Sequence, residues 1–167
     1  MIETLEAQIN LEKLRELYQH AEDHLPWSNS FPTLQSGISV AVGQEHDLLA
    51  ACGGNFSKEK EKLFTSLPHF YQNSYISELK SILGLNIYRL RWMKLSGKSC
   101  YSFHNDWTRR LHIPIITSPE SYVLFQNPLE LVHLQIGKAY LVDTTRKHTA
   151  MNTRDESRIH LIACVDE

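Results

Sequence analysis

Cysteine is scarce in this chain of 167 residues, and the few cysteines show no spacing typical of a disulfide or a zinc site. The three cysteines, Cys52, Cys100 and Cys164, are odd in number and widely spaced, and no CxxC pair occurs. Disulfide frameworks and cysteine-based zinc sites require closely matched cysteines, so we expect neither. Reduced, mostly buried thiols are typical of a cytoplasmic protein, which is the localisation we predict.

Long apolar runs and an excess of one charge are also missing. No segment approaches the roughly 20 apolar residues of a membrane-spanning helix. The first twenty residues are charged throughout and lack the apolar segment of a secretory signal. The formal net charge of −2 gives no long-range field that would attract nucleic acid or an anionic membrane surface. We therefore expect no nucleic-acid partner and no membrane partner.

The composition is that of an ordinary folded domain. Apolar residues make up 42% and charged residues 22%, and the length suits one core with little room for a second. We expect a single domain over 1–167, with a helical and irregular part at 1–84. Its helices are predicted at 3–24, after the N-cap candidate Ser57 and at 73–83, with loops and one strand, 38–42, between the first two.

From residue 85 onward, short runs alternate between apolar and polar side chains and are separated by turn residues. This pattern is typical of strands. The candidate strands are 87–95, 99–104, 111–116, 121–126, 131–135, 139–142 and 158–165. Helices followed by about seven short strands predict a mostly β fold, a barrel or jelly roll over 85–167 with helices packed on one side.

A candidate metal site follows the second of these strands. In an extended chain, the side chains of residues i and i+2 project to the same side, so His104 and Asp106 can bind the same metal ion. The same spacing at His20 and Glu22 lies in the predicted helix, where the two side chains point apart. Two imidazoles and one carboxylate on one face of an octahedron are the ligands of non-haem Fe(II) oxygenases. His148 lies downstream at a distance that a few strands fold back, and it is our third ligand.

Arg158, at the start of the last strand, suits the co-substrate of such an iron. A 2-oxoglutarate molecule that chelates iron places its distal carboxylate deeper in the barrel, where an arginine provides a fixed bidentate partner. Arg110 and His112 form one R-x-H pair, and Arg158 and His160 form another. We expect both pairs to line the barrel, since their apolar neighbours face the other way; a solvated outer face is the alternative.

Residues 101–167, about 40% of the chain, resemble the aspartyl/asparaginyl β-hydroxylase-like branch of the 2-oxoglutarate oxygenases. In that family an R-x-H segment follows the first metal histidine. An Asp precedes the second metal histidine, and an Asn and an Arg follow it. The matching segments are HND at 104–106, RRLHIPI at 109–115, VDTTRKHTAMN at 142–152 and RIHLIACVDE at 158–167.

The resemblance implies a double-stranded β-helix, a cupin-like jelly roll. It implies iron on His104, Asp106 and His148, with 2-oxoglutarate and O₂ as co-substrates. It further implies that Arg158 pairs with the distal carboxylate and that Arg110 and His112 help to hold the co-substrate. Asp143 and Asn152 would support the site, and we assign Asn152 and His160 to cofactor binding.

The implied reaction is hydroxylation of an amino acid, free or within a peptide or protein, with release of succinate and CO₂. Family members that act on epidermal-growth-factor-like domains lack the metal carboxylate, whereas Asp106 is present here, so their substrate does not transfer to this chain. Trp92 and Trp107 are candidates to flank the mouth of the site, and Trp27 and Phe31 are candidates for a lid at 26–32; ordinary aromatic packing is the alternative for each.

Two other classes of function stay open at the level of sequence. A cupin-type isomerase or epimerase shares the barrel and its histidines but does not need Arg158. A non-enzymatic metal-binding sensor domain does not need the complete ligand set. The oligomeric state, monomer or homodimer, is not determined by any motif.

Overall fold

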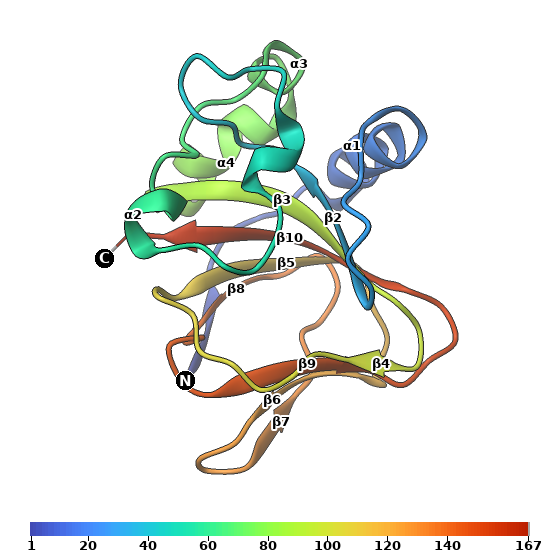
Figure 1. Cartoon of the computed structure of the whole chain (residues 1–167). Coiled ribbons are helices and arrows are strands. Elements are labelled where there is room, and N and C mark those ends of the chain that lie inside the picture. The colour runs from blue at the N-terminus through green and yellow to red at the C-terminus, as the bar shows by residue number, and fades with distance from the viewer. Residues whose placement is uncertain (167) are drawn as a thin grey trace.

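The computed structural model describes residues 1–166 and consists of two facing antiparallel sheets with helices on one side (Figure 1). The first half of the chain holds β1 (Ile2–Leu5), α1 (Leu11–His24), β2 (Thr33–Gly37), the 3₁₀ helix η1 (Leu48–Ala51), α2 (Lys58–Glu61), α3 (His69–Gln72) and α4 (Tyr75–Leu83). The second half holds β3 (Ile87–Leu95), β4 (Ser99–Cys100), β5 (Arg110–Ile116), β6 (Ser121–Phe125), β7 (Glu130–Val132), β8 (Ala139–Val142), β9 (His148–Asn152) and β10 (Arg158–Val165).

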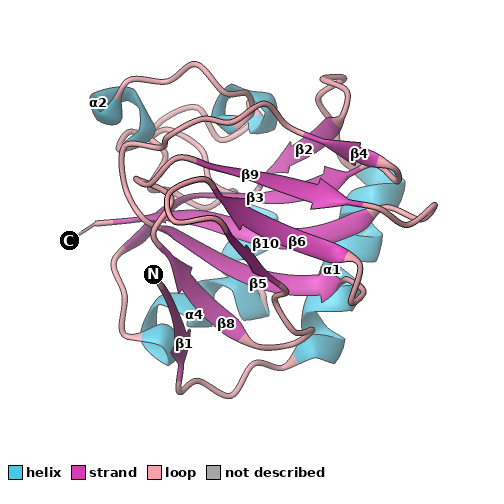
Figure 2. Ribbon diagram, turned by 90° about the horizontal axis from the view of Figure 1, so that it is seen from below, coloured by secondary structure: helices cyan, strands magenta, loops and turns pink. Residues whose placement is uncertain are grey.

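The two sheets form the double-stranded β-helix, or jelly roll, that the sequence predicts. The larger sheet has the strand order β1-β8-β5-β10-β3-β2, and the smaller has the order β4-β9-β6-β7. Figure 2 shows the smaller sheet crossing in front of the larger one. Strand β10 is central to the larger sheet, because it pairs with β5 on one side and β3 on the other.

Helices α1 and α4 cover the outer face of the larger sheet (Figure 1). Asn10 caps α1 by accepting from the backbone N–H of Lys13, and Gly84 ends α4 at a φ of 63°, in the left-handed region. The apolar positions of β5 and β10 pack against these helices. They are Leu111, Ile113, Ile115, Ile159, Leu161 and Ala163, all buried in one core cluster. The intervening polar residues of both strands therefore face the space between the sheets.

The predicted elements differ from the structure in several places. Residues 2–5 are not the start of the first helix but a strand that pairs with β8, and the helix begins only at Leu11. The early strand lies at 33–37, because its register with β3 runs from Thr33 to Gly37, and not at 38–42. Strand β9, which carries His148, was not among the predicted strands.

Within residues 1–166, no helix is both long enough and apolar enough to cross a membrane.

Candidate active site

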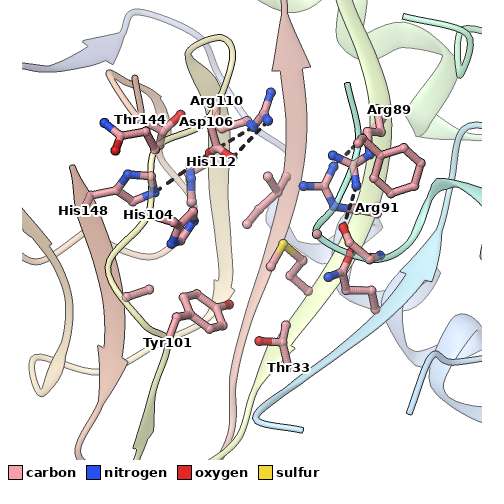
Figure 3. Close-up of a pocket in the computed structure, with 18 of the residues that line it drawn as sticks. Thr33, Arg89, Arg91, Tyr101, His104, Asp106, Arg110, His112, Thr144 and His148 are labelled. Atoms are coloured by element: carbon pink, nitrogen blue, oxygen red, sulfur yellow. Dashed lines mark hydrogen bonds and ion pairs between the residues drawn. The ribbon is translucent and has the colours of Figure 1, made fainter. Parts of the chain in front are cut away.

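A cavity of about 500 Å³ opens between the two sheets (Figure 3). His104, Asp106 and His148 line one wall, and Arg91 and Arg89 lie across from them. Arg158 also lines the cavity, from the start of β10. The cavity is polar because the inward positions of the larger sheet carry arginine and histidine where the outward positions carry aliphatic side chains.

The structure brings the three predicted metal ligands together. One ligand atom from each of His104, Asp106 and His148 lies within 4.8 Å of the others. The backbones of His104 and His148 exchange two hydrogen bonds, of 3.0 and 2.9 Å, which fixes the two imidazoles side by side. Asp106 lies two residues beyond His104, and its N–H donates to the carbonyl of Thr144 at 2.8 Å. Backbone pairing, and not side-chain contact alone, therefore positions the group.

Both histidines present the same nitrogen to the centre of this group. Nδ1 of His104 lies 3.0 Å from the carbonyl oxygen of Ser102, and Nδ1 of His148 lies 2.9 Å from that of Arg146. A carbonyl oxygen only accepts, so each Nδ1 carries the proton and donates it. This leaves Nε2 of each ring as the nitrogen available to a metal ion, which binds the neutral form of imidazole.

Asp106 is held by a buried ion network. The guanidinium of Arg110 lies 3.1 Å from one oxygen of Asp106 and donates to the other at 3.2 Å. Arg110 also donates to Glu61 at 2.7 Å, and Glu61 is paired with Arg89 on its other side. Burial alone would raise the pKa of Asp106, but Arg110 and then His148 lower it below its ordinary value. Asp106 is therefore a carboxylate, the form that a metal ion requires.

The cavity also contains buried polar atoms that have no hydrogen-bond partner among residues 1–166. Nε of Arg158 and the hydroxyl of Tyr101 are both buried without a hydrogen-bond partner among the described residues. No carboxylate within residues 1–166 forms an ion pair with Arg158. Burial lowers the pKa of Arg158 and Tyr101 raises it, so the two side chains lie close together. Buried polar groups in native proteins are nearly always paired, so this pair of side chains is a candidate site for an anion.

His112 and His160 lie between the metal ligands and Arg158 along the sheet. Their Nδ1 atoms are 3.3 Å apart, and both imidazoles are buried. His112 lines the cavity, while Nε2 of His160 is buried without a partner. Burial, and then the charge of Arg158, holds the pKa of both groups well below the ordinary value, so both are neutral at pH 7.

Two residues expected at the site lie away from it. Asn152 is buried, but its amide donates to the carbonyls of Ser96 and Glu156, and its oxygen accepts from Ser121. These bonds tie β9 to the turns beside it and leave no group for a cofactor. Asp143 accepts from Thr145 and lies 3.8 Å from the N-terminal ammonium, outside the cavity.

The expected aromatic mouth is only partly present. Trp107 lines the cavity, 60% exposed, and its indole N–H donates to the carbonyl of Phe56 at 2.7 Å. Trp92 is instead fully buried on the helix side of β3, where it donates to the hydroxyl of Tyr71. Trp27 packs edge-on against Tyr18, and Phe31 is exposed without lining the cavity, although the neighbouring Ser30 does line it.

Several residues that line this cavity were not predicted from the sequence, among them Tyr101, Arg89, Arg91, Glu61 and the loop 53–56. Arg89 and Arg91 carried a signal, because two arginines within the apolar run RLRWMKL require buried partners. Glu61 carried none, since its exposed neighbours in a short charged helix predict a solvated residue.

Solved structures share the fold. A 2-oxoglutarate–Fe(II) oxygenase family oxidoreductase from Burkholderia pseudomallei matches with a TM-score of 0.58 and 12% identity, over 93% of this chain and 77% of that chain. A viral collagen prolyl hydroxylase from Paramecium Bursaria Chlorella virus-1, in complex with 2-oxoglutarate, has a TM-score of 0.56 and 11% identity, over 98% and 94%. HygX from Streptomyces hygroscopicus, with nickel, 2-oxoglutarate and hygromycin B bound, has a TM-score of 0.56 and 9% identity, over 97% and 81%.

The sequence comparisons are more specific. Curated proteins give no match. The family model for aspartyl/asparaginyl beta-hydroxylase matches residues 65–167, which include all of the strands from β3 to β10 and every residue of the metal group. This match covers more than half of the chain, and the protein belongs to the aspartyl/asparaginyl beta-hydroxylase family.

Proposed function

We propose that this protein is an Fe(II)- and 2-oxoglutarate-dependent dioxygenase. In this proposal His104, Asp106 and His148 hold the iron. The observation that carries it is the donor set: two imidazoles, each with Nδ1 held by a backbone carbonyl, and one ionised carboxylate, with one ligand atom from each residue within 4.8 Å of the others. Three protein ligands on one face of an octahedral ion leave three adjacent positions for other ligands.

Arg158 and Tyr101 would bind the distal carboxylate of 2-oxoglutarate. Both present unsatisfied buried donors at the end of the cavity, and a dicarboxylate would supply the missing acceptors. His112 lines the same cavity and, being neutral, has one ring nitrogen that donates and one that accepts. Its contact with His160 uses Nδ1, so Nε2 is the atom available to the co-substrate.

We propose a different role for Arg110 from the one that the family resemblance implies. Its guanidinium is already engaged by Asp106, Glu61, Thr108 and the sulfur of Cys164. We therefore assign it to positioning: it holds Asp106 ionised and oriented toward the metal and does not bind the co-substrate itself.

When bound, iron with 2-oxoglutarate and O₂ supplies the oxidising power that inserts oxygen into a C–H bond and leaves succinate and CO₂. The substrate we propose is an amino acid, free or within a peptide or protein, in keeping with the family to which the chain belongs. Trp107 and the loop 53–56, joined by the hydrogen bond from Trp107 to Phe56, border the cavity where such a substrate would enter.

The test is a titration of the Fe(II)-loaded protein with 2-oxoglutarate under nitrogen, followed by visible absorption. We expect a weak charge-transfer band that is absent in His104→Ala and Arg158→Ala. A well-folded, iron-loaded wild type that develops no band rejects the proposal. An isomerase or a binding domain of the same fold would then be favoured, since neither requires 2-oxoglutarate.

A further inference from the structure

Arg91 is a buried arginine that the proposed co-substrate does not use. Its side chain is 6% exposed, and it lies on β3 facing the cavity. One of its terminal nitrogens donates to the backbone carbonyl of Arg89 at 3.0 Å, whereas Nε is buried with no hydrogen-bond partner among the described residues. Among residues 1–166, Arg91 forms no ion pair with a carboxylate. A buried guanidinium left in this state is costly unless an anion binds it.

The sheet register separates Arg91 from Arg158. Arg91 lies opposite Ile162 of β10, and Ile162 lies opposite His112 of β5, so these three residues form one row across the sheet. Arg158 is four residues from Ile162, which is about 13 Å along a strand. The neighbouring row contains Cys164 and Arg110, and Arg110 contacts Asp106. Arg91 is therefore close to the level of the metal ligands, while Arg158 is deeper.

The charges around the cavity leave room for another anion. Four arginines line it, Arg89, Arg91, Arg110 and Arg158, against two carboxylates, Glu61 and Asp106, which gives 4 − 2 = +2. A divalent metal ion adds two positive charges, and the dicarboxylate 2-oxoglutarate removes two. The excess of +2 therefore persists in the loaded site, and Glu61 and Asp106 are already paired with Arg89 and Arg110.

We propose that Arg91 determines substrate specificity by pairing with a carboxylate of the substrate beside the metal. This inference rests on the proposed function, because 2-oxoglutarate must occupy Arg158 for Arg91 to remain free. Gln35 lies one row deeper on β2, opposite Met93, and also lines the cavity. Its side-chain oxygen accepts from the N–H of Gly53 at 3.3 Å, so its amide N–H₂ points elsewhere and can donate to the same carboxylate.

Two sources of such a carboxylate are distinguishable: the α-carboxylate of a free amino acid, and the side chain of an acidic residue within a peptide. The cavity of about 500 Å³ lies in the range that encloses small ligands, and it also admits one side chain of a larger partner. Both sources use the same guanidinium–carboxylate pairing, so Arg91 is required in either case.

The experiment measures binding by calorimetry to protein loaded with Fe(II) and saturated with 2-oxoglutarate under nitrogen. One arm uses the twenty free amino acids and their α-carboxamides. The other uses N-acetyl, N-methylamide derivatives of aspartate and glutamate, each compared with its asparagine or glutamine counterpart. The variants are Arg91→Met and Arg91→Lys, with Arg154→Met as the control, because the side chain of Arg154 is exposed and pairs with Glu156 outside the cavity.

We expect at least one carboxylate probe to bind the wild type and the Arg154→Met variant, and its amide counterpart not to bind. Affinity should fall tenfold or more in Arg91→Met and less in Arg91→Lys, which keeps the charge but loses the bidentate fork. The affinity for 2-oxoglutarate should stay within twofold of wild type in both, which also shows that the variants fold.

Three results overturn the inference. Carboxylate and amide probes bind alike; or a carboxylate probe binds Arg91→Met as well as wild type; or no carboxylate probe in either arm binds a wild type that does bind 2-oxoglutarate. A loss of 2-oxoglutarate binding in Arg91→Met would make Arg91 the co-substrate residue instead. A wild type that does not bind 2-oxoglutarate is a separate failure, that of the proposed function, and removes the basis of this inference with it.

Discussion

At the scale of single residues, the cavity is defined by which polar atoms have partners and which do not. The carboxylate of Asp106 is paired, whereas Nε of Arg158, Nε of Arg91 and the hydroxyl of Tyr101 are buried without hydrogen-bond partners in the part of the chain that the structure describes. Unsatisfied donors cost free energy in a folded protein unless a ligand supplies acceptors. The donors of Arg158, Arg91 and Tyr101 line the cavity and are therefore the atoms at which we expect a ligand with acceptor groups.

Tyr101→Phe removes the hydroxyl donor of Tyr101 and keeps its aromatic ring. If the hydroxyl donates to the distal carboxylate of 2-oxoglutarate, the affinity for this molecule should fall about tenfold, since hydrogen bonds to charged groups contribute about 1.5–3 kcal/mol. Calorimetry on the Fe(II)-loaded protein without oxygen measures the affinity for 2-oxoglutarate. Tyr122→Phe on β6 is the matched control, because Tyr122 does not line the cavity. Equal affinities in both variants would remove Tyr101 from the co-substrate site.

Arg110→Lys tests the positioning of Asp106. A lysine retains the charge, but its ammonium cannot bridge Asp106 and Glu61 as the planar guanidinium does. Loss of a group that orients a metal ligand commonly reduces metal affinity by about 10- to 100-fold, and we expect a change of that order. Competition with a chromophoric chelator reports it. An affinity equal to that of Arg154→Lys, an exposed replacement, would show that Asp106 needs no such support.

Site residues that are close together in the sequence could be predicted from their spacing. Site residues that are brought together only by folding could not. His104 and Asp106 are two positions apart, and the alternation of β5 and β10 identified the strand faces of Arg110 and Arg158. Glu61 and Tyr101 become part of the cavity only when distant segments fold together. Asn152 was assigned to cofactor binding because of its position after His148, whereas the structure shows its amide hydrogen-bonded to the carbonyls of two turns.

At the scale of elements, the turn that joins β3 to β4 fixes the end of the cavity that contains Arg158 and Tyr101. Lys98 in this turn donates its backbone N–H to the carbonyl of Arg154 at 2.7 Å, just before β10 begins. A Cβ atom at Gly97 would lie 1.9 Å from the carbonyl oxygen of Asp155. The two turns can approach this closely only because residue 97 has no side chain.

Gly97→Ala should therefore lower the free energy of unfolding by about 1–3 kcal/mol, the usual cost of forcing extra atoms into a packed contact. Urea denaturation measures the change. Gly54→Ala is the control, because a Cβ atom there meets nothing within 4 Å, and we expect a change within about 0.5 kcal/mol. A Gly97→Ala variant as stable as the control would mean that the two turns separate freely.

Long periodic segments allowed both the type and the position of an element to be predicted. Short strands could not be located from the sequence. The alternation in β3, β5 and β10 located these strands within one or two residues. Strand β1 was absorbed into the predicted helix because four residues cannot establish a period, and its strand conformation depends on pairing with β8. Strand β9 is polar at three of five positions, so only its pairing with β6 and β4 makes it a strand.

At the scale of the whole molecule, the jelly roll buries apolar residues on one side of its larger sheet and charged residues on the other. The helix side has a continuous aliphatic and aromatic core, whereas only a small cluster around Phe125 and Val142 lies between the sheets. Stability therefore comes mainly from the helix side, and the space between the sheets is left for polar chemistry. Folding must bring the ionisable side chains there out of water.

This arrangement predicts that the metal-free protein loses stability in mild acid. His112 and His160 are buried, and their pKa values in the folded state are well below 6.5, mainly because of burial. As the pH falls below 6.5, the unfolded chain takes up protons at these positions and the folded chain does not. The unfolded state is therefore favoured, by up to about 1.4 kcal/mol per pH unit for each histidine, while above this range the contribution is constant.

Urea denaturation of the metal-free protein between pH 8 and pH 5.5 measures this dependence. The free energy of unfolding should decline below about pH 6.5 in the wild type, and His160→Gln should decline less steeply, because glutamine does not titrate. The same variant lowers stability at pH 8 only through packing, so the slope separates the two effects. A His160→Gln variant with an unchanged slope would show that the space between the sheets admits enough water for the imidazole to be protonated in the folded state.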